Sequence, residues 1–240
     1  MIHELMMENL QRFMIEKVCR EVENLSFLYY YYLRKGDNMS RYHQIDTCNM
    51  VNGEGIRTVI WLSGCPFHCK ACFNPTTWNP QGGKEVTSFV IQDVLKGVES
   101  PYCDGLTLLG GEPLTPYNVE VSTCLAKETK RMGKTVWCYT GYTYEHIKDL
   151  EIMQYIDVLI DGRFILSQFN PNLKWRGSAN QRVIDVQKTR YLGTGMIVLH
   201  PDNNFVDKYY PEQAFDPCEG MTNEEIKEKY IDNVCDEGLN

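Results

Sequence analysis

The sequence predicts an α/β protein built as an open, partial (β/α) barrel with parallel strands and outer helices. From about residue 57 onward, short apolar segments rich in β-forming residues alternate with amphipathic helical segments. This alternation is typical of βαβ units, and therefore of a mostly parallel sheet covered by helices. The apolar segments are too few for a closed eight-stranded barrel, so we expect an open one.

The expected strands are short apolar runs, most of which are followed by glycine. The first run, 58–62, lies between Gly55 and Gly64. The later runs are 106–109, 135–139, 156–160 and 183–186, with a weaker sixth run at 196–199. Glycine after an apolar run marks a turn or loop, so each run is expected to leave the sheet there.

Three segments with apolar residues at helical spacing separate these strands, at 88–98, 119–132 and 144–153. Helices in these positions would connect parallel strands. In such folds the carboxyl ends of the strands gather at one edge of the sheet, where the chemistry is found. The motifs that follow the strands are therefore the candidates for a functional site.

The two ends of the chain differ from the central domain, for which we predict the bounds 39–190. Residues 1–38 have helical spacing and end before Met39. They are interpreted either as a docking helix or as an extension upstream of a true first residue at Met39. Residues 191–240 are interpreted as an acidic C-terminal extension with one helix, at 222–234.

Charge and composition exclude several classes of function. The formal net charge is −8, and the last forty residues, with eleven acids and three lysines, account for all of it. A neutral body with an acidic tail disfavours nucleic acid as a partner. No apolar run is long enough for a membrane span, and the N-terminus lacks the pattern of a secretory signal. We therefore expect a cytoplasmic protein whose ten cysteines do not form a disulfide framework.

The sharpest motif is the cysteine loop, residues 63–74, in which Cys65, Cys69 and Cys72 have the spacing C-x3-C-x2-C. Iron–sulfur clusters and structural zinc sites usually take four protein ligands, and this loop offers three cysteines. A four-iron cluster held by three thiolates would leave one iron open for a substrate. The alternatives are a zinc site completed by His68 and a set of inert thiols, and the spacing favours the cluster.

A second motif, Gly110-Gly111-Glu112-Pro113, follows the second expected strand. Paired glycines at a strand end let a ligand approach the backbone closely, because no Cβ intervenes. The Glu112 carboxylate could accept a hydrogen bond from an ammonium group. Taken alone, this motif is also typical of an ordinary turn.

Together the two motifs resemble those of the radical S-adenosylmethionine superfamily, and more narrowly its activases for anaerobic ribonucleoside-triphosphate reductase. The supporting segments are 51–57, 73–78, 139–142, 157–164 and 175–182. The resemblance implies the partial-barrel fold of that superfamily, and a 4Fe–4S cluster on Cys65, Cys69 and Cys72 that binds S-adenosylmethionine at its open iron.

The resemblance also assigns residues to S-adenosylmethionine itself. Gly110, Gly111 and Glu112 would receive the methionine end, and Ala71 and Phe73 would line the adenosyl part. Cys72 would bind the cofactor as well as the cluster. Members of the family usually carry tyrosine where this chain has Phe73, and many end before the acidic extension of this chain. The first difference hardly disturbs the assignment, and the second leaves the extension unexplained.

The implied function is the activation of another enzyme. Reductive cleavage of S-adenosylmethionine would give a 5′-deoxyadenosyl radical, which abstracts a glycine Cα hydrogen from the large, glycyl-radical subunit of the reductase. A flavodoxin-type electron donor and a homodimer are implied as well. The alternatives are an activase for another glycyl-radical enzyme, such as pyruvate formate-lyase, a small-molecule radical enzyme, and a non-catalytic zinc-binding module.

Other polar residues near the strand ends have two interpretations each. Asp161 could contact a ribose or help to order the site, and it could equally be a turn residue before a glycine. Arg163 and Arg176 could pair with a ligand carboxylate or with the partner protein, or lie on the surface. Tyr139 and Thr140 are expected to line the pocket.

Overall fold

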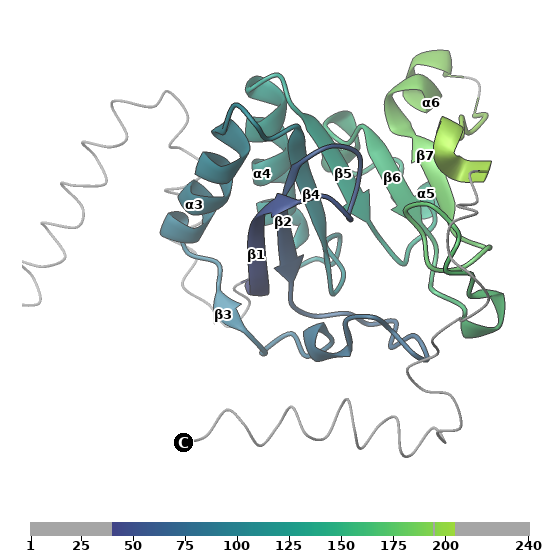
Figure 1. Cartoon of the computed structure of the whole chain (residues 1–240), viewed down its shortest axis with the longest axis horizontal. Coiled ribbons are helices and arrows are strands. Elements are labelled where there is room, and N and C mark those ends of the chain that lie inside the picture. The colour runs from purple at the N-terminus through teal and green to yellow at the C-terminus, as the bar shows by residue number, and fades with distance from the viewer. Residues whose placement is uncertain (1–39, 194, 205–240) are drawn as a thin grey trace, which may run out of the picture. The chain divides into compact units, whose positions relative to one another are not determined.

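The computed structural model describes residues 40–193 and 195–204 (Figure 1). The expectations for residues 1–38 and for a helix at 222–234 lie outside the described residues. The described part is built around one seven-stranded sheet in the order β3-β1-β2-β4-β5-β6-β7. Within that part, no helix is both long and apolar enough to cross a membrane.

The four central strands of the sheet are parallel. They are β2 (Arg57–Leu62), β4 (Gly105–Gly110), β5 (Thr135–Tyr139) and β6 (Val158–Asp161). Antiparallel pairing adds β1 (Arg41–Asn49) and β3 (Lys84–Glu85) on one side and β7 (Arg182–Asp185) on the other. The central strands consist almost entirely of buried residues, as expected for parallel strands covered on both faces.

Helices α3 (Ser88–Glu99) and α4 (Val119–Arg131) pack against the central strands and against each other (Figure 1). In α3, Ile91, Val94 and Val98 recur at helical spacing and are buried. The Thr87 side chain caps the helix by accepting a hydrogen bond from the N–H of Val90. The shorter helices are α5 (Tyr144–Ile147), α6 (Val186–Leu192), η1 (Pro75–Thr77), η2 (Glu151–Gln154), η3 (Leu166–Gln168) and η4 (Pro201–Asn204).

The buried guanidinium of Arg57 links the amino ends of the central strands. The Arg57 side chain has no exposed surface and donates hydrogen bonds to Thr107, Thr135 and the carbonyls of Glu54 and Leu106. Its guanidinium also lies 5.4 Å from the centroid of the Trp137 ring. Burial lowers the pKa of Arg57 to about 10, so the side chain stays charged at neutral pH.

The α/β class is confirmed, and the expectations for the sheet hold in part. The sheet is open, as expected, but its curvature into a partial barrel is not confirmed. Parallel pairing holds only for the centre of the sheet, since β7 runs antiparallel to β6. The connection between these two strands contains no α-helix to carry the chain back across the sheet, so the chain returns in the opposite direction.

Three local expectations also differ from the structure. The helix expected at 144–153 is split into α5 and η2, because Leu150 adopts an extended backbone conformation. The weak run 196–199 forms only an isolated bridge, between Ile184 and Leu199. Strand β1 was not expected, because its sequence RYHQIDTCN is largely polar and its residues are mostly half-buried or exposed.

Candidate functional site

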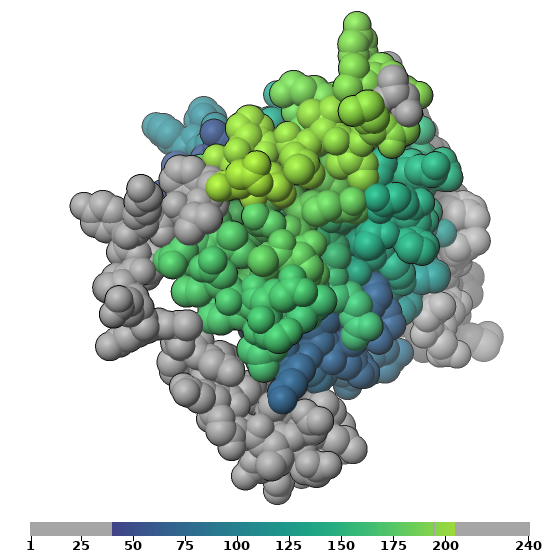
Figure 2. Space-filling view, turned by 90° about the vertical axis from the view of Figure 1, so that its right-hand side faces the viewer, coloured from purple at the N-terminus to yellow at the C-terminus, as the bar shows by residue number. Residues whose placement is uncertain are grey.

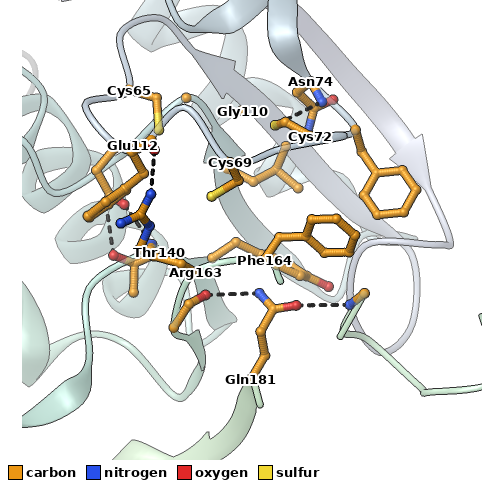
Figure 3. Close-up of a pocket in the computed structure, with 18 of the residues that line it drawn as sticks. Cys65, Cys69, Cys72, Asn74, Gly110, Glu112, Thr140, Arg163, Phe164 and Gln181 are labelled. Carbon is orange, nitrogen blue, oxygen red and sulfur yellow. Dashed lines mark hydrogen bonds between the residues drawn. The ribbon is translucent and has the colours of Figure 1, made fainter. Parts of the chain in front are cut away.

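A pocket with a volume of about 250 Å³ lies at the carboxyl ends of the central strands. One side of it is the cysteine loop, and the other is the segment between β6 and β7, residues 162–181, which we call the far wall (Figure 3). Green residues of the far wall form much of the surface on the side shown in Figure 2. The lining residues are Asn52, Cys65, Phe67, Cys69, Cys72, Phe73, Asn74, Leu109, Gly110, Gly111, Glu112, Tyr139, Thr140, Gly141, Gly162, Arg163, Phe164, Arg176, Gly177 and Gln181.

The cysteine loop leaves the end of β2 and is held by backbone hydrogen bonds. The N–H of Gly64 donates to the carbonyl of Thr77 at 2.6 Å, and the N–H of Cys65 donates to that of Trp78 at 3.1 Å. Two non-glycine residues within the loop, His68 (φ 44°) and Ala71 (φ 56°), adopt left-handed backbone conformations. Such conformations are uncommon for these residue types and bend the chain tightly.

The two glycines after β4 are required by the packing of the backbone. A Cβ on Gly110 would lie 2.7 Å from the backbone N of Leu62, and a Cβ on Gly111 would lie 2.4 Å from the carbonyl O of Gly64. The N–H of Glu112 donates to that same Gly64 carbonyl at 2.7 Å. The glycines line the pocket, and the absence of their Cβ atoms lets the end of β4 pack directly against the end of β2 and the start of the cysteine loop.

The three loop cysteines all line the pocket, and all are free thiols (Figure 3). Burial raises the pKa of Cys65 to about 12, against a hydrogen bond from the backbone of Phe67 that lowers it. Burial also raises the pKa of Cys72, whose Sγ accepts a hydrogen bond from the N–H of Asn74 at 3.3 Å. Without a bound cation these two thiols are neutral, so a metal centre would have to stabilise their thiolate forms.

Glu112 is fully buried, and its carboxylate joins the ends of β4 and β5. One carboxylate oxygen accepts hydrogen bonds from the N–H of Leu114 and the hydroxyl of Thr140, both at 2.9 Å. The other accepts from the N–H of Gly141 at 2.8 Å and has no second partner among the described residues. Burial raises the pKa of Glu112 to about 7, although these three donors lower it.

Side-chain hydrogen bonds hold the far wall together. The Gln181 carbonyl oxygen accepts from the N–H groups of Gly177 and Ser178, and its amide nitrogen donates to the carbonyl of Gly162 at 3.0 Å. The Asn180 amide donates to the carbonyl of Arg163 at 2.8 Å. These bonds fold an irregular segment into a fixed surface that faces the cysteines (Figure 3).

Two arginines connect the far wall to its surroundings. Arg163 donates to the carbonyl of Phe67 at 2.6 Å, and its guanidinium lies 5.4 Å from the centroid of the Phe67 ring, so it reaches the cysteine loop. Arg176 donates to the carbonyls of Ala179, Gln181 and Asn203. The second arginine therefore has a structural task, in addition to its place in the pocket lining.

Most of the residues predicted for the site lie together in this pocket: Cys65, Cys69, Cys72, Phe73, Gly110, Gly111, Glu112, Tyr139, Thr140, Arg163 and Arg176. Ala71 is buried and is not a lining residue. Asp161 is not a lining residue either, because its carboxylate accepts hydrogen bonds from Arg182 and from the N–H of Tyr144. The predicted contacts of Ala71 and Asp161 with the cofactor stay predictions.

Nine lining residues were not predicted for the site: Asn52, Phe67, Asn74, Leu109, Gly141, Gly162, Phe164, Gly177 and Gln181. Phe67 packs where Gly141 leaves room, since a Cβ at that glycine would lie 2.3 Å from the Phe67 ring. Asn52 and Gln181 belong to segments that support the family resemblance, and the sequence predicted no role for either one. Gly141 indicates that a neighbouring group occupies the place of a side chain. The sequence does not identify that group as Phe67, because the two residues lie far apart in the chain.

The donor set fits a cluster better than a single metal ion. Among the described residues, no three His, Cys, Asp or Glu side chains are arranged to hold one ion. A zinc site needs all its ligands within about 2.3 Å of a single ion. In a four-iron cluster each thiolate binds a different iron, so three cysteines that line one pocket are compatible with a cluster.

Comparison with known proteins identifies relatives of the chain. Residues 51–184 match the family model described as a 4Fe-4S single cluster domain. Three similar proteins are each called "anaerobic ribonucleoside-triphosphate reductase-activating protein". The one from Enterobacteria phage T4 is 40% identical over 144 residues, which cover 59% of this chain and 92% of the relative. The one from Vibrio cholerae is 38% identical (58% and 94% covered), and that from Escherichia coli K12 is 33% identical (59% and 96% covered).

Proposed function

This chain belongs to the family of anaerobic ribonucleoside-triphosphate reductase-activating proteins and carries a 4Fe–4S single cluster domain, and on that premise we propose that it is a radical S-adenosylmethionine enzyme. Cys65, Cys69 and Cys72 would hold the cluster. The observation that carries the proposal is that these three cysteines line the same pocket as Gly110, Gly111 and Glu112.

The cluster and S-adenosylmethionine, when bound, would supply the radical chemistry. That chemistry would be a reductive one, directed at a glycine Cα hydrogen of the reductase. The protein's own residues have the tasks of binding, orienting and excluding water. Gly110, Gly111 and Glu112 would receive the methionine end of the cofactor beside the cluster.

The residues around the cysteines suit the methionine end of such a cofactor. One oxygen of Glu112 has a single hydrogen-bond partner among the described residues, so it can accept from an ammonium group. Gly110 and Gly111 line the pocket, so their backbone could contact a bound group. Phe67, Phe73 and Phe164 line the rest of the space and would limit the entry of water.

The partner proposed for the chain is the glycyl-radical subunit of anaerobic ribonucleoside-triphosphate reductase, since the relatives are named for activating that enzyme. These names favour it over pyruvate formate-lyase. The zinc-binding alternative has no support from the described side chains, which form no single-ion site. A flavodoxin-type donor, a homodimer and a cytoplasmic location stay predictions.

The test is anaerobic reconstitution with iron and sulfide, followed by reduction and EPR spectroscopy with and without S-adenosylmethionine. We expect the signal of a reduced 4Fe–4S cluster that shifts when S-adenosylmethionine is added. Stoichiometric zinc and no cluster would overturn the proposal. Cys69→Ala should abolish cleavage of S-adenosylmethionine, whereas Cys48→Ala, which changes an exposed cysteine outside the pocket, should leave it intact.

A further inference from the structure

Three phenylalanine rings lie together where the cysteine loop meets the far wall. Phe73 belongs to the loop, and Phe164 and Phe169 belong to the far wall. The centroid of the Phe73 ring lies 5.4 Å from that of Phe164 and 6.0 Å from that of Phe169. The centroids of the two far-wall rings are 6.1 Å apart. These distances are typical of aromatic rings in contact, and we call the three residues the aromatic rim.

The aromatic rim joins the pocket to the solvent. Phe73 and Phe164 line the pocket, and Phe73 is nevertheless 59% exposed (Figure 3). Phe169 is half-buried and is not a lining residue, so it extends the apolar surface beyond the pocket. Single exposed apolar side chains are common on proteins, whereas a cluster from two segments at the edge of a pocket indicates a binding surface.

The backbone of the far wall has a place for these rings. A Cβ on Gly177 would lie 3.0 Å from the Phe73 ring and 3.1 Å from the Phe164 ring. The N–H of Gly177 donates to the Gln181 side chain at 3.0 Å, which holds this backbone in position. The two rings therefore pack directly on the far wall, at the edge of the pocket.

The charged residues of the far wall already have partners. The far wall contains no Asp or Glu, and its cations are Arg163, Lys174 and Arg176. Arg163 binds the Phe67 carbonyl, Arg176 binds three carbonyls, and Lys174 forms an ion pair with Asp202. The rim is thus suited to an apolar side chain, and less to an acidic segment such as the C-terminal extension of this chain.

The proposed substrate needs such a surface. Glycine has no side chain, so a segment that presents a glycine must gain its affinity from neighbouring residues. A pocket of about 250 Å³ is small even for a ligand site, and the neighbours of the glycine would have to lie outside it. Aromatic side chains at such positions supply a large part of the affinity of an interface.

We propose that the aromatic rim binds an apolar or aromatic side chain next to the target glycine of the reductase, an inference that rests on the proposed function. The rim would hold the segment outside while the glycine enters the pocket. Phe169 has no place in the pocket lining, so its task is recognition of the partner.

The test is the dissociation constant for the glycyl-radical subunit, measured anaerobically with the reconstituted full-length chain. Phe169→Ala should raise it about tenfold, which corresponds to about 1.4 kcal/mol. Phe169→Tyr keeps the ring and should bind like the wild type. Phe89→Ala is the matched control, because Phe89 is 75% exposed on α3 and is not a lining residue.

A change in the partner locates the contact. In the subunit, the apolar side chains that flank the target glycine are replaced by serine, and Phe169→Ala should then cause no further loss. The inference is overturned if Phe169→Ala binds as tightly as the wild type, or if its loss persists with the altered subunit. Tighter binding by Phe169→Ala would also overturn it, because the rim would then be covered by a competing segment of this chain.

Hydrogen exchange of the unaltered chain serves in case Phe169→Ala does not fold. The amides of residues 164–169 and of Gly177 should exchange more slowly when the subunit is added, and the altered subunit should protect them less. Equal exchange with and without the subunit overturns the inference. The proposed function is tested without the reductase and fails separately, if the wild type binds no cluster.

Discussion

The two sides of the pocket are built in different ways. The cysteine loop is held by backbone hydrogen bonds and by glycines that allow backbones to touch, as at Gly64 and Gly111. The far wall has almost no regular structure and is held by side chains, chiefly Gln181 and Arg176, that bind backbone carbonyls and N–H groups. The side formed by the cysteine loop therefore tolerates little change in shape, whereas the far wall can be altered one hydrogen bond at a time.

The largest effect is expected from Gly110→Ala. The new Cβ would meet the backbone at Trp61 and Leu62 at 2.7 Å, in a residue with φ of +108°. Backbone strain and overpacking together should lower the free energy of unfolding by about 3 kcal/mol or more. Urea unfolding of the apoprotein and iron content after reconstitution measure the loss.

Gly133→Ala is the control for that experiment. Gly133 also has a positive φ, of +72°, but nothing lies within 4 Å of its Cβ position. We therefore expect a cost of only about 1 to 2 kcal/mol, from the left-handed conformation alone, and normal iron content. Equal losses in the two variants would show that contact between the backbones does not hold the cysteine side.

The next effect concerns charge on the cysteine side. The pKa of Glu112 is raised to about 7 in the fold, against 4.5 as the ordinary value. Between these values the folded protein holds a proton that the unfolded chain has released. Protonated Glu112 therefore contributes about 3 kcal/mol to the free energy of unfolding, relative to high pH. This contribution is fully present below pH 4.5 and is lost as the pH rises through 7.

Urea unfolding of the apoprotein at pH 5 and pH 8 measures this dependence, with Glu112→Gln as the reference. The variant has altered hydrogen bonds at both pH values. The informative quantity is therefore the difference between the free energies of unfolding at pH 5 and pH 8. It should be smaller in the variant than in the wild type. An identical pH dependence in both proteins would contradict the shifted pKa.

A smaller and more local effect is expected from Gln181→Ala in the far wall. The variant loses the bonds to Gly177, Ser178 and Gly162, at a cost of about 1 to 2 kcal/mol. Hydrogen exchange of the Gly177 and Ser178 amides should become faster, while iron content stays normal. Gln187→Ala also breaks side-chain bonds to carbonyls, but away from the pocket, and should not change these two amides. Loss of iron in Gln181→Ala would show that the two sides are not independent.

The smallest effect is expected from Arg163→Lys, which alters the contact between the two sides. Arg163 is exposed, and its side chain donates one hydrogen bond to the Phe67 carbonyl and lies over the Phe67 ring. Lysine keeps the charge and loses the planar group. The free energy of unfolding should fall by less than about 1 kcal/mol, or a few degrees in the midpoint of thermal unfolding. A loss as large as that of Gln181→Ala would make this arginine a main support of the pocket.

Much of the sheet could be predicted because its central strands are apolar and end near glycines. The expected run 135–139 coincides with β5, and 58–62 differs from β2 by one residue. The polar strand β1 and the antiparallel direction of β7 could not be predicted in this way, since they depend on pairing with distant residues. An open sheet and a partial barrel give the same alternation of segments in sequence.

The candidate site was predictable where residues adjacent in sequence act together. The spacing of Cys65, Cys69 and Cys72 and the Gly110-Gly111 pair are local patterns. Phe67 and Gln181 contribute through contacts with residues 74 and 19 positions away, which no local pattern reveals. Asp161 was given two interpretations, as a ligand contact or a turn residue, and no local pattern revealed the hydrogen bond that its carboxylate accepts from Arg182.

The order of the strands has a consequence for how the protein is made. From β1 onward, apart from β3, each strand lies beside the one that precedes it in the chain. The sheet can therefore grow along one edge while the chain is being synthesised. The cysteine loop is then complete long before Gln181 is synthesised, an interval on the order of ten seconds at ordinary translation rates. During that interval the far wall does not yet cover the cysteines of the nascent chain. They are then more accessible to iron delivery, and to oxygen, than in the completed pocket.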